Sequence, residues 1–369
     1  MELQQLLSHY SEYANECLEY RNNEEFNQRL DAGDIEGYEI YLRNPDGDDL
    51  NIGPLSATLF VSDLPAYRQL VNSDLETRRK DILNVDEFTN NENAYDQLLS
   101  LIRNKATVIP FVGAGFSVAA GCPSWSEYIV SQAVNARMVE EDVRQRLKAG
   151  EHEQLMNEVI DKLSLNIFQR DFRAQFEGSK ISPSLSPSSE LIGLFDECYI
   201  TTNFDRVLEQ CHDEFLPFAE KPVGQENNGR YLKAVYRSEK YLLKLHGNID
   251  DQTNRILTLD EYNAGYGEGG IDYNLPIPRT LNKIFNNYTV LFVGCSLIAD
   301  RYLEILKASF EASPEFLPDH FAILVAPDDE DELIERDKYL ASHGITPIWF
   351  REGDWDRPGD ILKLLKIEK

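Results

Sequence analysis

The residues of this chain best suited to chemistry stand directly after short apolar runs. A Gly-Ala-Gly turn with a nearby serine comes first, followed by a Thr-Asn-Phe-Asp segment, a His-Gly pair and a Gly-Cys-Ser segment. An imidazole with a pKa near neutrality can accept a proton, an amide can orient a water or a hydroxyl without adding charge, and glycines let a backbone approach a phosphate closely. The candidate residues are Gly113, Ala114, Gly115, Ser117, Thr202, Asn203, Asp205, His246, Gly294 and Ser296.

The first apolar run, Val108–Val112, predicts the element that positions the glycine turn. It is rich in β-branched residues, ends in two glycines that flank a small residue, and is followed by a helix-compatible stretch. A buried parallel strand turns into a helix in this way, and the first N–H groups of that helix can hold a phosphate. Because glycines also serve ordinary tight turns, the motif needs support from the rest of the chain.

Further apolar runs alternate with helical patterns from about residue 91 onward. We predict strands at 198–202, 241–245, 290–293, 320–325 and 346–350, helices at 94–104, 125–150, 151–176 and 358–367, and a Ser/Pro-rich loop at 179–189. This alternation predicts a doubly wound parallel α/β sheet with a helical insertion at roughly 125–190. In such sheets ligands bind at the carboxyl ends of the strands, which is where the candidate residues stand.

The N-terminal part of the chain differs from the rest, and we divide the chain into 1–95 and 96–369. Leu, Tyr and Phe recur at helical spacing in 1–30, a strand is predicted at Tyr38–Leu42, and the segments around it are rich in turn residues. The acidic stretch Asn44–Asp49 lacks the spaced ligands of a calcium loop, so a solvated turn is expected. We interpret 1–95 as an α+β accessory or assembly segment.

Composition limits the classes of protein to which the chain can belong. Its 369 residues carry a formal net charge of −28, which argues against a nucleic-acid-binding surface. No apolar run reaches the ~18 residues of a membrane span, and the N-terminus lacks the pattern of a secretory signal. The five cysteines are scattered and never form Cys-x-x-Cys, so a cytoplasmic protein without a structural zinc site is expected.

Taken in order, the four motifs resemble those of the sirtuin superfamily. They are Gly113-Ala114-Gly115-Phe116-Ser117, Thr202-Asn203-Phe204-Asp205, Leu245-His246-Gly247 and Gly294-Cys295-Ser296, and the resemblance extends from about Thr107 to Val325. Sirtuins bind NAD in a Rossmann-like domain and cleave its nicotinamide–ribose bond.

This resemblance implies a role for each candidate residue. Asn203 is expected beside the nicotinamide ribose, Asp205 near the carboxamide, and His246 as the general base. The remaining cofactor-binding residues are expected at the diphosphate (Gly113, Ala114, Gly115 and Ser117) and at the adenosine end (Gly294 and Ser296). Thr202 is included as cofactor-binding, although it stands where sirtuins usually carry Gln.

Two departures from the sequence pattern of sirtuin deacylases indicate which members of the superfamily the chain resembles. The two Cys-x-x-Cys pairs of the deacylase zinc module are absent, and Gly121–Ser126 replaces the Gly-Ile-Pro-Asp-Phe-Arg segment. The chain thereby resembles sirtuin-like effectors of bacterial anti-phage defence, which destroy NAD+ with water as nucleophile. That resemblance implies a homo-oligomer regulated through a partner, either a HerA-family hexameric ATPase or an Argonaute-type protein.

Simpler interpretations exist for the individual residues and for the whole chain. His246 could be a core histidine, Asn203 or Asp300 a helix-start residue, Gly294 and Ser296 a plain turn, and Trp125 and Cys295 parts of the core. The stretch Glu261–Asp272 is compatible both with a mobile lid and with a surface loop. Alternatives for function are an NAD-dependent protein deacylase or ADP-ribosyltransferase, and a non-catalytic NAD or ADP-ribose sensor.

Overall fold

The structure of the chain is a computed structural model that describes residues 18–35, 54–85, 89–177, 180–195, 197–212, 217–218, 225–249, 255–298 and 300–369. It divides into two compact units, Met1–Ile82 and Leu83–Lys369. The strand predicted at Tyr38–Leu42 and the turn at Asn44–Asp49 lie outside the described residues.

The smaller unit is helical in its described part. It contains α2 (Glu24–Ala32), α3 (Leu55–Ser62) and nearly all of α4 (Leu64–Leu83). The side chains of Phe26 and Tyr67 form its core with neighbouring apolar residues, and their rings meet edge to face at 5.6 Å. The four motifs of the candidate site, between residues 113 and 296, all lie in the larger unit.

The larger unit is built on the parallel sheet that the sequence predicts, and this expectation is confirmed. Seven strands pair in parallel in the order β3-β4-β2-β1-β5-β6-β7. They are β1 (Val108–Val112), β2 (Cys198–Thr201), β3 (Pro217–Phe218), β4 (Tyr241–Lys244), β5 (Thr289–Val293), β6 (His320–Val325) and β7 (Ile345–Phe350). The strand order reverses direction at β1 and β5, which makes their carboxyl ends the switch point of the sheet.

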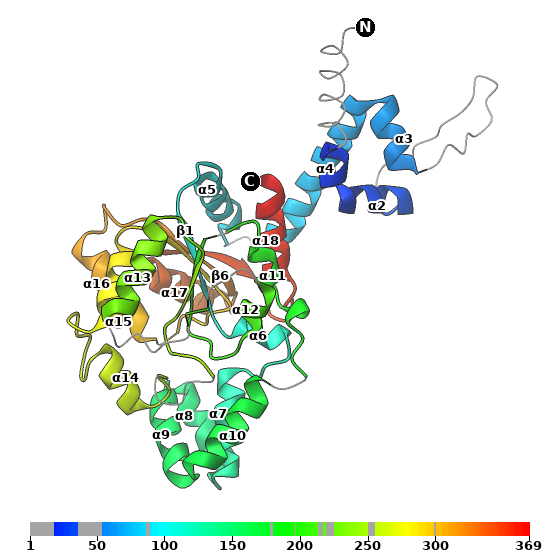
Figure 1. Cartoon of the computed structure of the whole chain (residues 1–369). Coiled ribbons are helices and arrows are strands. Elements are labelled where there is room, and N and C mark those ends of the chain that lie inside the picture. The colour runs from blue at the N-terminus through cyan, green and yellow to red at the C-terminus, as the bar shows by residue number, and fades with distance from the viewer. Residues whose placement is uncertain are drawn as a thin grey trace, which may run out of the picture. The chain divides into compact units, whose positions relative to one another are not determined.

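Helices cover both faces of this sheet, which explains why β1, β2 and β5 are buried along their whole length (Figure 1). One face packs against α13 (Gln225–Tyr236), α15 (Pro276–Phe285), α16 (Arg301–Ala312) and α17 (Glu330–Ala341). On the other side of the sheet in Figure 1 lie α5 (Asn91–Arg103), α11 (Ser188–Leu191), α12 (Val207–Cys211) and the closing helix α18 (Arg357–Glu368).

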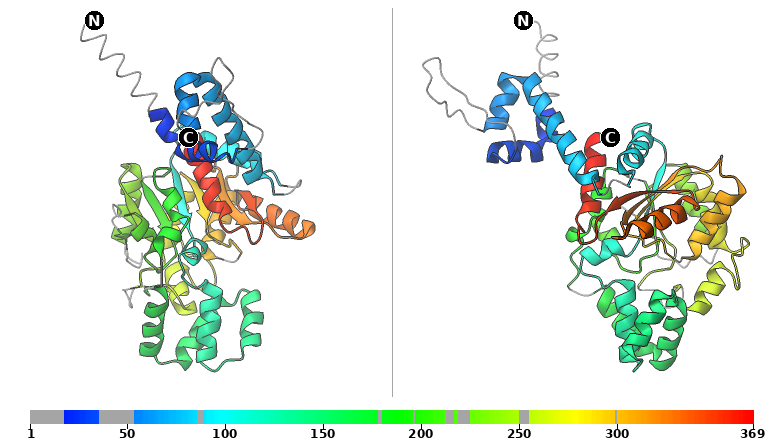
Figure 2. Two further views of the ribbon diagram at one scale, coloured as in Figure 1. Left: turned by 90° about the vertical axis from the view of Figure 1, so that its right-hand side faces the viewer. Right: turned by 180° about the vertical axis from the view of Figure 1, so that it is seen from behind.

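Four helices of the insertion form a separate layer at one end of the sheet, as Figure 2 shows from two sides. They are α7 (Trp125–Asn135), α8 (Glu140–Lys148), α9 (His152–Lys162) and α10 (Leu165–Phe176), and a short 3₁₀ helix at Pro183–Leu185 follows. Their core is aromatic, and it takes in Phe204 from the loop after β2, whose ring lies 5.3 Å from that of Phe172. The insertion therefore packs directly on a loop that carries candidate residues.

Trp125 belongs to this aromatic core. Its ring stacks on that of Tyr128 at 5.7 Å and lies 6.0 Å from that of Phe204. These ring contacts are sufficient to explain why a tryptophan stands at position 125.

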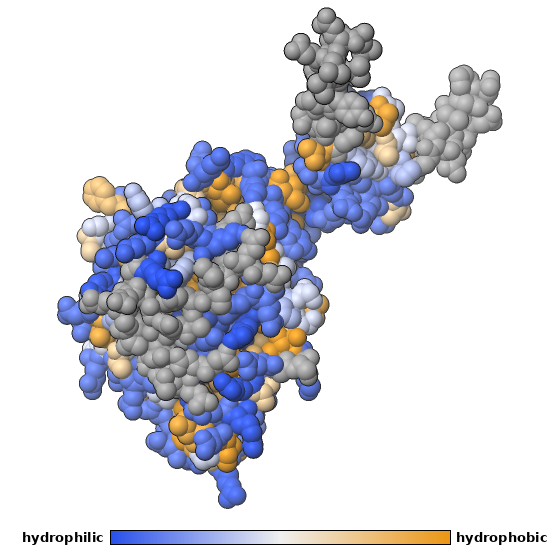
Figure 3. All heavy atoms as spheres, in the orientation of Figure 1, coloured by the Kyte–Doolittle hydropathy of each residue, from blue (hydrophilic) through white to orange (hydrophobic). Residues whose placement is uncertain are grey.

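The surface agrees with the acidic composition of the chain. On the face of the larger unit seen in Figure 3, hydrophilic residues dominate outside the grey regions, and apolar residues form small separate patches. Within the described residues, no helix combines the length and apolar character that crossing a membrane requires.

Candidate functional site

The strand register brings four predicted motifs to one edge of the sheet. Val112 pairs with both Thr201 and Val293, and Thr201 pairs in turn with Lys244. Since these residues end or nearly end their strands, the loops that follow β1, β2, β4 and β5 begin level with one another. The candidate site is the set of residues that these four loops carry.

The turns after β1 and β5 interlock through glycines. The N–H of Gly113 donates to Val293 O at 2.8 Å, and the N–H of Gly115 donates to Gly294 O at 2.9 Å. A Cβ on Gly113 would lie 2.5 Å from that same Gly294 oxygen, so no larger residue fits. These two N–H groups are therefore used inside the fold, and what the glycines provide is close approach of the two backbones.

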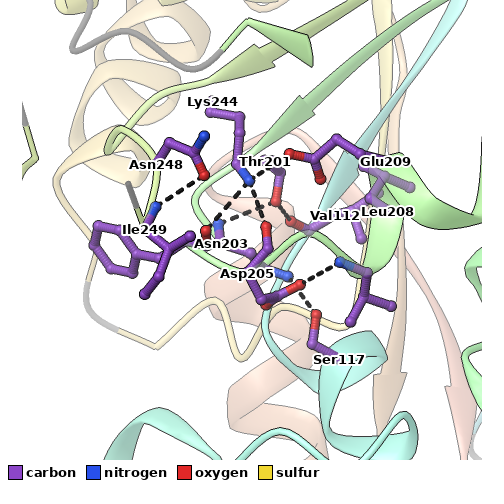
Figure 4. A network of polar contacts seen from close by, with 12 residues as sticks. Val112, Ser117, Thr201, Asn203, Asp205, Leu208, Glu209, Lys244, Asn248 and Ile249 are labelled. Atoms are coloured by element: carbon purple, nitrogen blue, oxygen red, sulfur yellow. Dashed lines mark hydrogen bonds and ion pairs between the residues drawn. The ribbon is translucent and has the colours of Figure 1, made fainter. Parts of the chain in front are cut away.

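Asn203 links the loop after β2 to the glycine turn. Its Nδ2 donates to Gly113 O at 3.0 Å and to Ser117 Oγ at 3.1 Å, and its own N–H donates to Thr201 Oγ1 at 3.0 Å. Thr201 Oγ1 donates in turn to Val112 O at 2.7 Å. Figure 4 shows from close by the part of this network that joins Asn203, Thr201 and Val112. Asn203 is only 9% exposed, whereas the neighbouring Thr202 is partly exposed.

Asp205 lies deeper in the same network. Its carboxyl accepts a hydrogen bond from the Val207 N–H at 2.9 Å and another from the hydroxyl of Ser117. Burial raises the pKa of Asp205 above its ordinary value, while the nearby Lys244 ammonium opposes that rise. Ser117 thus joins two predicted residues, Asn203 and Asp205, in one chain of hydrogen bonds.

His246 occupies a pocket of aromatic side chains after β4. Its Nε2 lies 2.9 Å from the hydroxyl of Tyr266 and its Nδ1 lies 3.4 Å from that of Tyr262. Both tyrosines come from α14 (Leu259–Tyr266), so a helix occupies the first half of the stretch Glu261–Asp272 that was considered as a lid or a loop. Burial lowers the pKa of His246 to about 3, instead of the near-neutral value expected from the sequence.

The loop after β5 is held by α17. Arg336 Nη2 donates to the carbonyl oxygens of Ser296 at 2.6 Å and Leu297 at 2.7 Å. Ser296 itself is exposed, whereas Leu297 is buried with a left-handed φ of 52°. Cys295 packs beside the glycine turn, and its Sγ would lie 2.7 Å from a Cβ on Gly113.

A polar cluster near Asp300 fixes α14 to the helical insertion. Asp300 accepts a hydrogen bond from the Tyr302 hydroxyl at 2.8 Å, and burial raises the pKa of its carboxyl. The next residue, Arg301, forms a 2.7 Å ion pair with Glu153 of α9 and donates at 2.8 Å to Asn263 of α14. Its guanidinium also lies 5.5 Å from the centre of the Tyr262 ring.

The predicted residues thus fall into two groups. Asn203 and Asp205 both contact Ser117, and Asn203 also contacts Gly113 of the glycine turn, which in turn contacts Gly294. His246 belongs to a separate tyrosine cluster, and within the described part of the chain no hydrogen bond joins it to Asn203. Three further polar residues of the site, Lys244, Arg301 and Arg336, were missed by the sequence analysis.

The buried histidine leads to a prediction for stability against pH. The pKa of His246 is about 3 in the folded chain and about 6.5 when unfolded, so between these values only the unfolded chain takes up the proton. Stability contributed by the neutral imidazole is therefore lost as the pH falls below about 6.5, by at most about 1.4 kcal/mol per pH unit. His246→Gln is expected to flatten the acid side of a chemical-denaturation series run from pH 7 to pH 4. An unchanged slope would contradict the buried neutral state.

Comparisons with known proteins give similarities to the same superfamily that the four motifs resemble. Residues 197–348 match a family model described as "SIR2-like domain". The chain is also similar to "NAD(+) hydrolase ThsA" of Enterococcus faecium, with 24% identity over 203 residues, which cover 55% of this chain and 40% of that protein. In the described residues, no group of three or more His, Cys, Asp or Glu side chains is placed to hold a metal ion.

The matched region contains β2 to β6 and the first part of β7, and with them the Asn203, His246 and Gly294 loops. The glycine turn after β1 lies outside that region but contacts Gly294 directly. The part of the chain that is similar to a SIR2-like domain thus includes most of the loops that form the candidate site.

Proposed function

We propose that the chain is an NAD+ hydrolase that cleaves the nicotinamide–ribose bond and releases nicotinamide and ADP-ribose. The observation that carries this proposal is the meeting of the Gly113 turn, the Asn203 loop and the Gly294 turn at the switch point of a SIR2-like sheet. Dinucleotides bind in this position in doubly wound sheets. The name of the Enterococcus relative, an NAD(+) hydrolase, supports the same reaction.

In the proposed reaction a water oxygen forms a bond to the ribose C1′ as the bond from C1′ to the nicotinamide nitrogen breaks. The bonding electron pair leaves with nicotinamide, and the water proton passes to His246. Asn203 orients the water or a ribose hydroxyl, and Asp205 lies near the carboxamide. Dipoles fixed in place before the reaction would stabilise the cationic character that develops at the ribose.

The other binding roles follow from the same placement. We propose that Gly113, Ala114, Gly115, Ser117 and Thr202 lie along the diphosphate, and that Gly294 and Ser296 lie at the adenosine end. Because the N–H groups of Gly113 and Gly115 donate within the fold, these two glycines contribute the close packing of the turns after β1 and β5 instead of hydrogen-bond donors to the diphosphate.

The biological setting is part of the proposal and rests on resemblance. We propose a cytoplasmic effector of anti-phage defence that depletes NAD+ and is kept inactive by assembly or by a partner. Residues 1–95 are the proposed assembly segment and 96–369 the catalytic domain. The partner is a HerA-family ATPase, with an Argonaute-type protein as the rival.

Product analysis with NAD+ labelled in both halves tests the reaction. Hydrolysis releases nicotinamide and free ADP-ribose in equal amounts, whereas a transferase leaves the ADP-ribose label on protein and a deacylase requires an acylated substrate. The assay is run on the full chain alone and together with the product of the neighbouring gene. Absence of nicotinamide release in both conditions would reject the hydrolase.

One observation favours a second candidate, a sensor that binds NAD+ or ADP-ribose without turnover. His246 is buried and weakly basic in this structure, since burial lowers its pKa to about 3. A general base works best when its pKa lies near the working pH. Binding of NAD+ in calorimetry without release of nicotinamide would favour the sensor.

A further inference from the structure

Lys244 is a fully buried cation at the centre of the candidate site. It stands at the end of β4, after three apolar residues, and its side chain is 0% exposed. Its Nζ forms a 2.7 Å ion pair with Glu209 of α12, and it also contacts the carbonyl oxygens of Phe204, at 3.4 Å, and of Asp205. Figure 4 shows the ammonium group pointing at the loop that follows β2.

A buried ion pair is weak evidence for stability. Removing an ammonium and a carboxylate from water has a desolvation penalty that their mutual attraction often fails to exceed, and apolar residues of similar volume can replace such pairs without loss. The ion pair uses Oε1 of Glu209, whereas the buried Oε2 of the same carboxylate has no hydrogen-bond partner among the described residues. General stabilisation of the fold therefore explains this lysine poorly.

The Lys244 ammonium binds two consecutive carbonyl oxygens, those of Phe204 and Asp205, in an irregular segment. Residues 202–206 form neither helix nor strand, so their backbone oxygens need partners from elsewhere in the fold. Phe204 O also accepts a hydrogen bond from the Ile249 N–H at 3.1 Å, so Lys244 shares this carbonyl with the loop after β4. On the opposite side of this segment, Asn203 reaches the carbonyl of Gly113 and Asp205 reaches the hydroxyl of Ser117. The segment is thus held from one side by its own side chains and from the other by the Lys244 ammonium.

We propose that Lys244 is a positioning residue, whose ammonium fixes the backbone of Phe204 and Asp205 so that Asn203 and Asp205 face the substrate site. The proposal rests on the proposed function in so far as that site takes NAD+. Glu209 keeps the ammonium in place and compensates its charge. Lys244 touches no substrate, so its effect is on the rate of reaction through geometry.

The test replaces both members of the ion pair in the full chain. Lys244→Met alone would leave a buried, uncompensated Glu209, so Lys244→Met is combined with Glu209→Gln. Tyr199→Phe is the matched control, because it removes a buried hydroxyl on β2 that donates to Leu191 O at 3.1 Å and to Phe195 O, neither of which belongs to residues 202–210. Each protein is measured for kcat and KM of nicotinamide release and for amide hydrogen exchange.

We expect the double variant to lose on the order of 10²-fold in kcat, with KM changed less than about threefold, because small misplacements of reacting groups have effects of this size. Peptides covering 202–210 are expected to exchange faster than in Tyr199→Phe at equal global stability. A kcat equal to that of the control would overturn the proposal, and so would unchanged exchange in 202–210.

The two proposals can fail separately. If the wild-type chain releases no nicotinamide, the proposed function fails, and exchange in 202–210 still decides whether Lys244 holds the loop. If wild type and double variant are equally active, the function stands and the role of Lys244 is rejected.

Discussion

Replacing His246 by glutamine is expected to lower the rate of nicotinamide release by about 10²–10⁴-fold, the usual contribution of a general base. Glutamine fills a similar volume and can still bond to the hydroxyls of Tyr262 and Tyr266, which lie 3.4 and 2.9 Å from the imidazole nitrogens. It cannot take up a proton. Steady-state kinetics with NAD+, together with a thermal melt to show that the fold is retained, checks this expectation.

His320 offers a matched control for this experiment. It is also fully buried, its Nδ1 accepts a hydrogen bond from the Val290 N–H at 3.1 Å, and burial lowers its pKa to about 4. Because it lies in β6, outside the four loops of the site, His320→Gln is expected to keep wild-type kcat. If both variants retain full activity, His246 is not the base, even where hydrolysis itself is confirmed.

The low basicity of His246 places a condition on the proposed mechanism. Neither ring nitrogen is open to a new partner while both tyrosine hydroxyls remain in place. Proton transfer to His246 therefore requires a rearrangement at α14, or passage of the proton through the Tyr262 hydroxyl, which belongs to the more exposed of the two tyrosines. Tyr262→Phe distinguishes these two routes. It removes the hydroxyl through which the proton would pass, and it leaves Nδ1 of His246 free to accept a proton directly.

The sequence predicted the sheet well because its strands are buried on both faces. Such strands are continuous apolar runs that end abruptly in glycine or polar residues, and β1 and β5 both follow this pattern. Their parallel pairing then dictates that the motifs share one edge. The two-residue strand β3 was missed, since Pro217–Phe218 is too short to produce a pattern.

The partners of the site residues could not be predicted in the same way. Lys244 does stand out in the sequence as a charge within an apolar strand, but its partner Glu209 lies 35 residues earlier and is identified only by the fold. The same holds for Arg336, which reaches the loop after β5 from 39 and 40 residues away. Nor does the sequence reveal that burial would make His246 a weak base, since desolvation depends on the complete tertiary environment.

At Gly294, within the candidate site, even the smallest substitution is expected to destabilise the larger unit clearly. It has a left-handed φ of 66°, and a Cβ there would lie 2.8 Å from the backbone nitrogen of Phe116 and 2.9 Å from its ring. A left-handed non-glycine residue costs about 1–2 kcal/mol and overpacking about 1–3 kcal/mol. Gly294→Ala is thus expected to lower the free energy of unfolding by roughly 2–5 kcal/mol, measured by urea denaturation.

Substitutions at two other glycines measure separately the two contributions to this loss of stability, the left-handed backbone and the steric overlap. Gly353 has a φ of 87° with nothing within 4 Å of an added Cβ, so Gly353→Ala reports the left-handed backbone alone. Gly113 has no left-handed φ, but its Cβ would lie 2.5 Å from Gly294 O, so Gly113→Ala reports the close approach alone. If Gly294→Ala were no less stable than Gly353→Ala, the turns after β1 and β5 could part at little cost. In that case Gly113 and Gly294 would be required for substrate binding and not for the contact between the two turns.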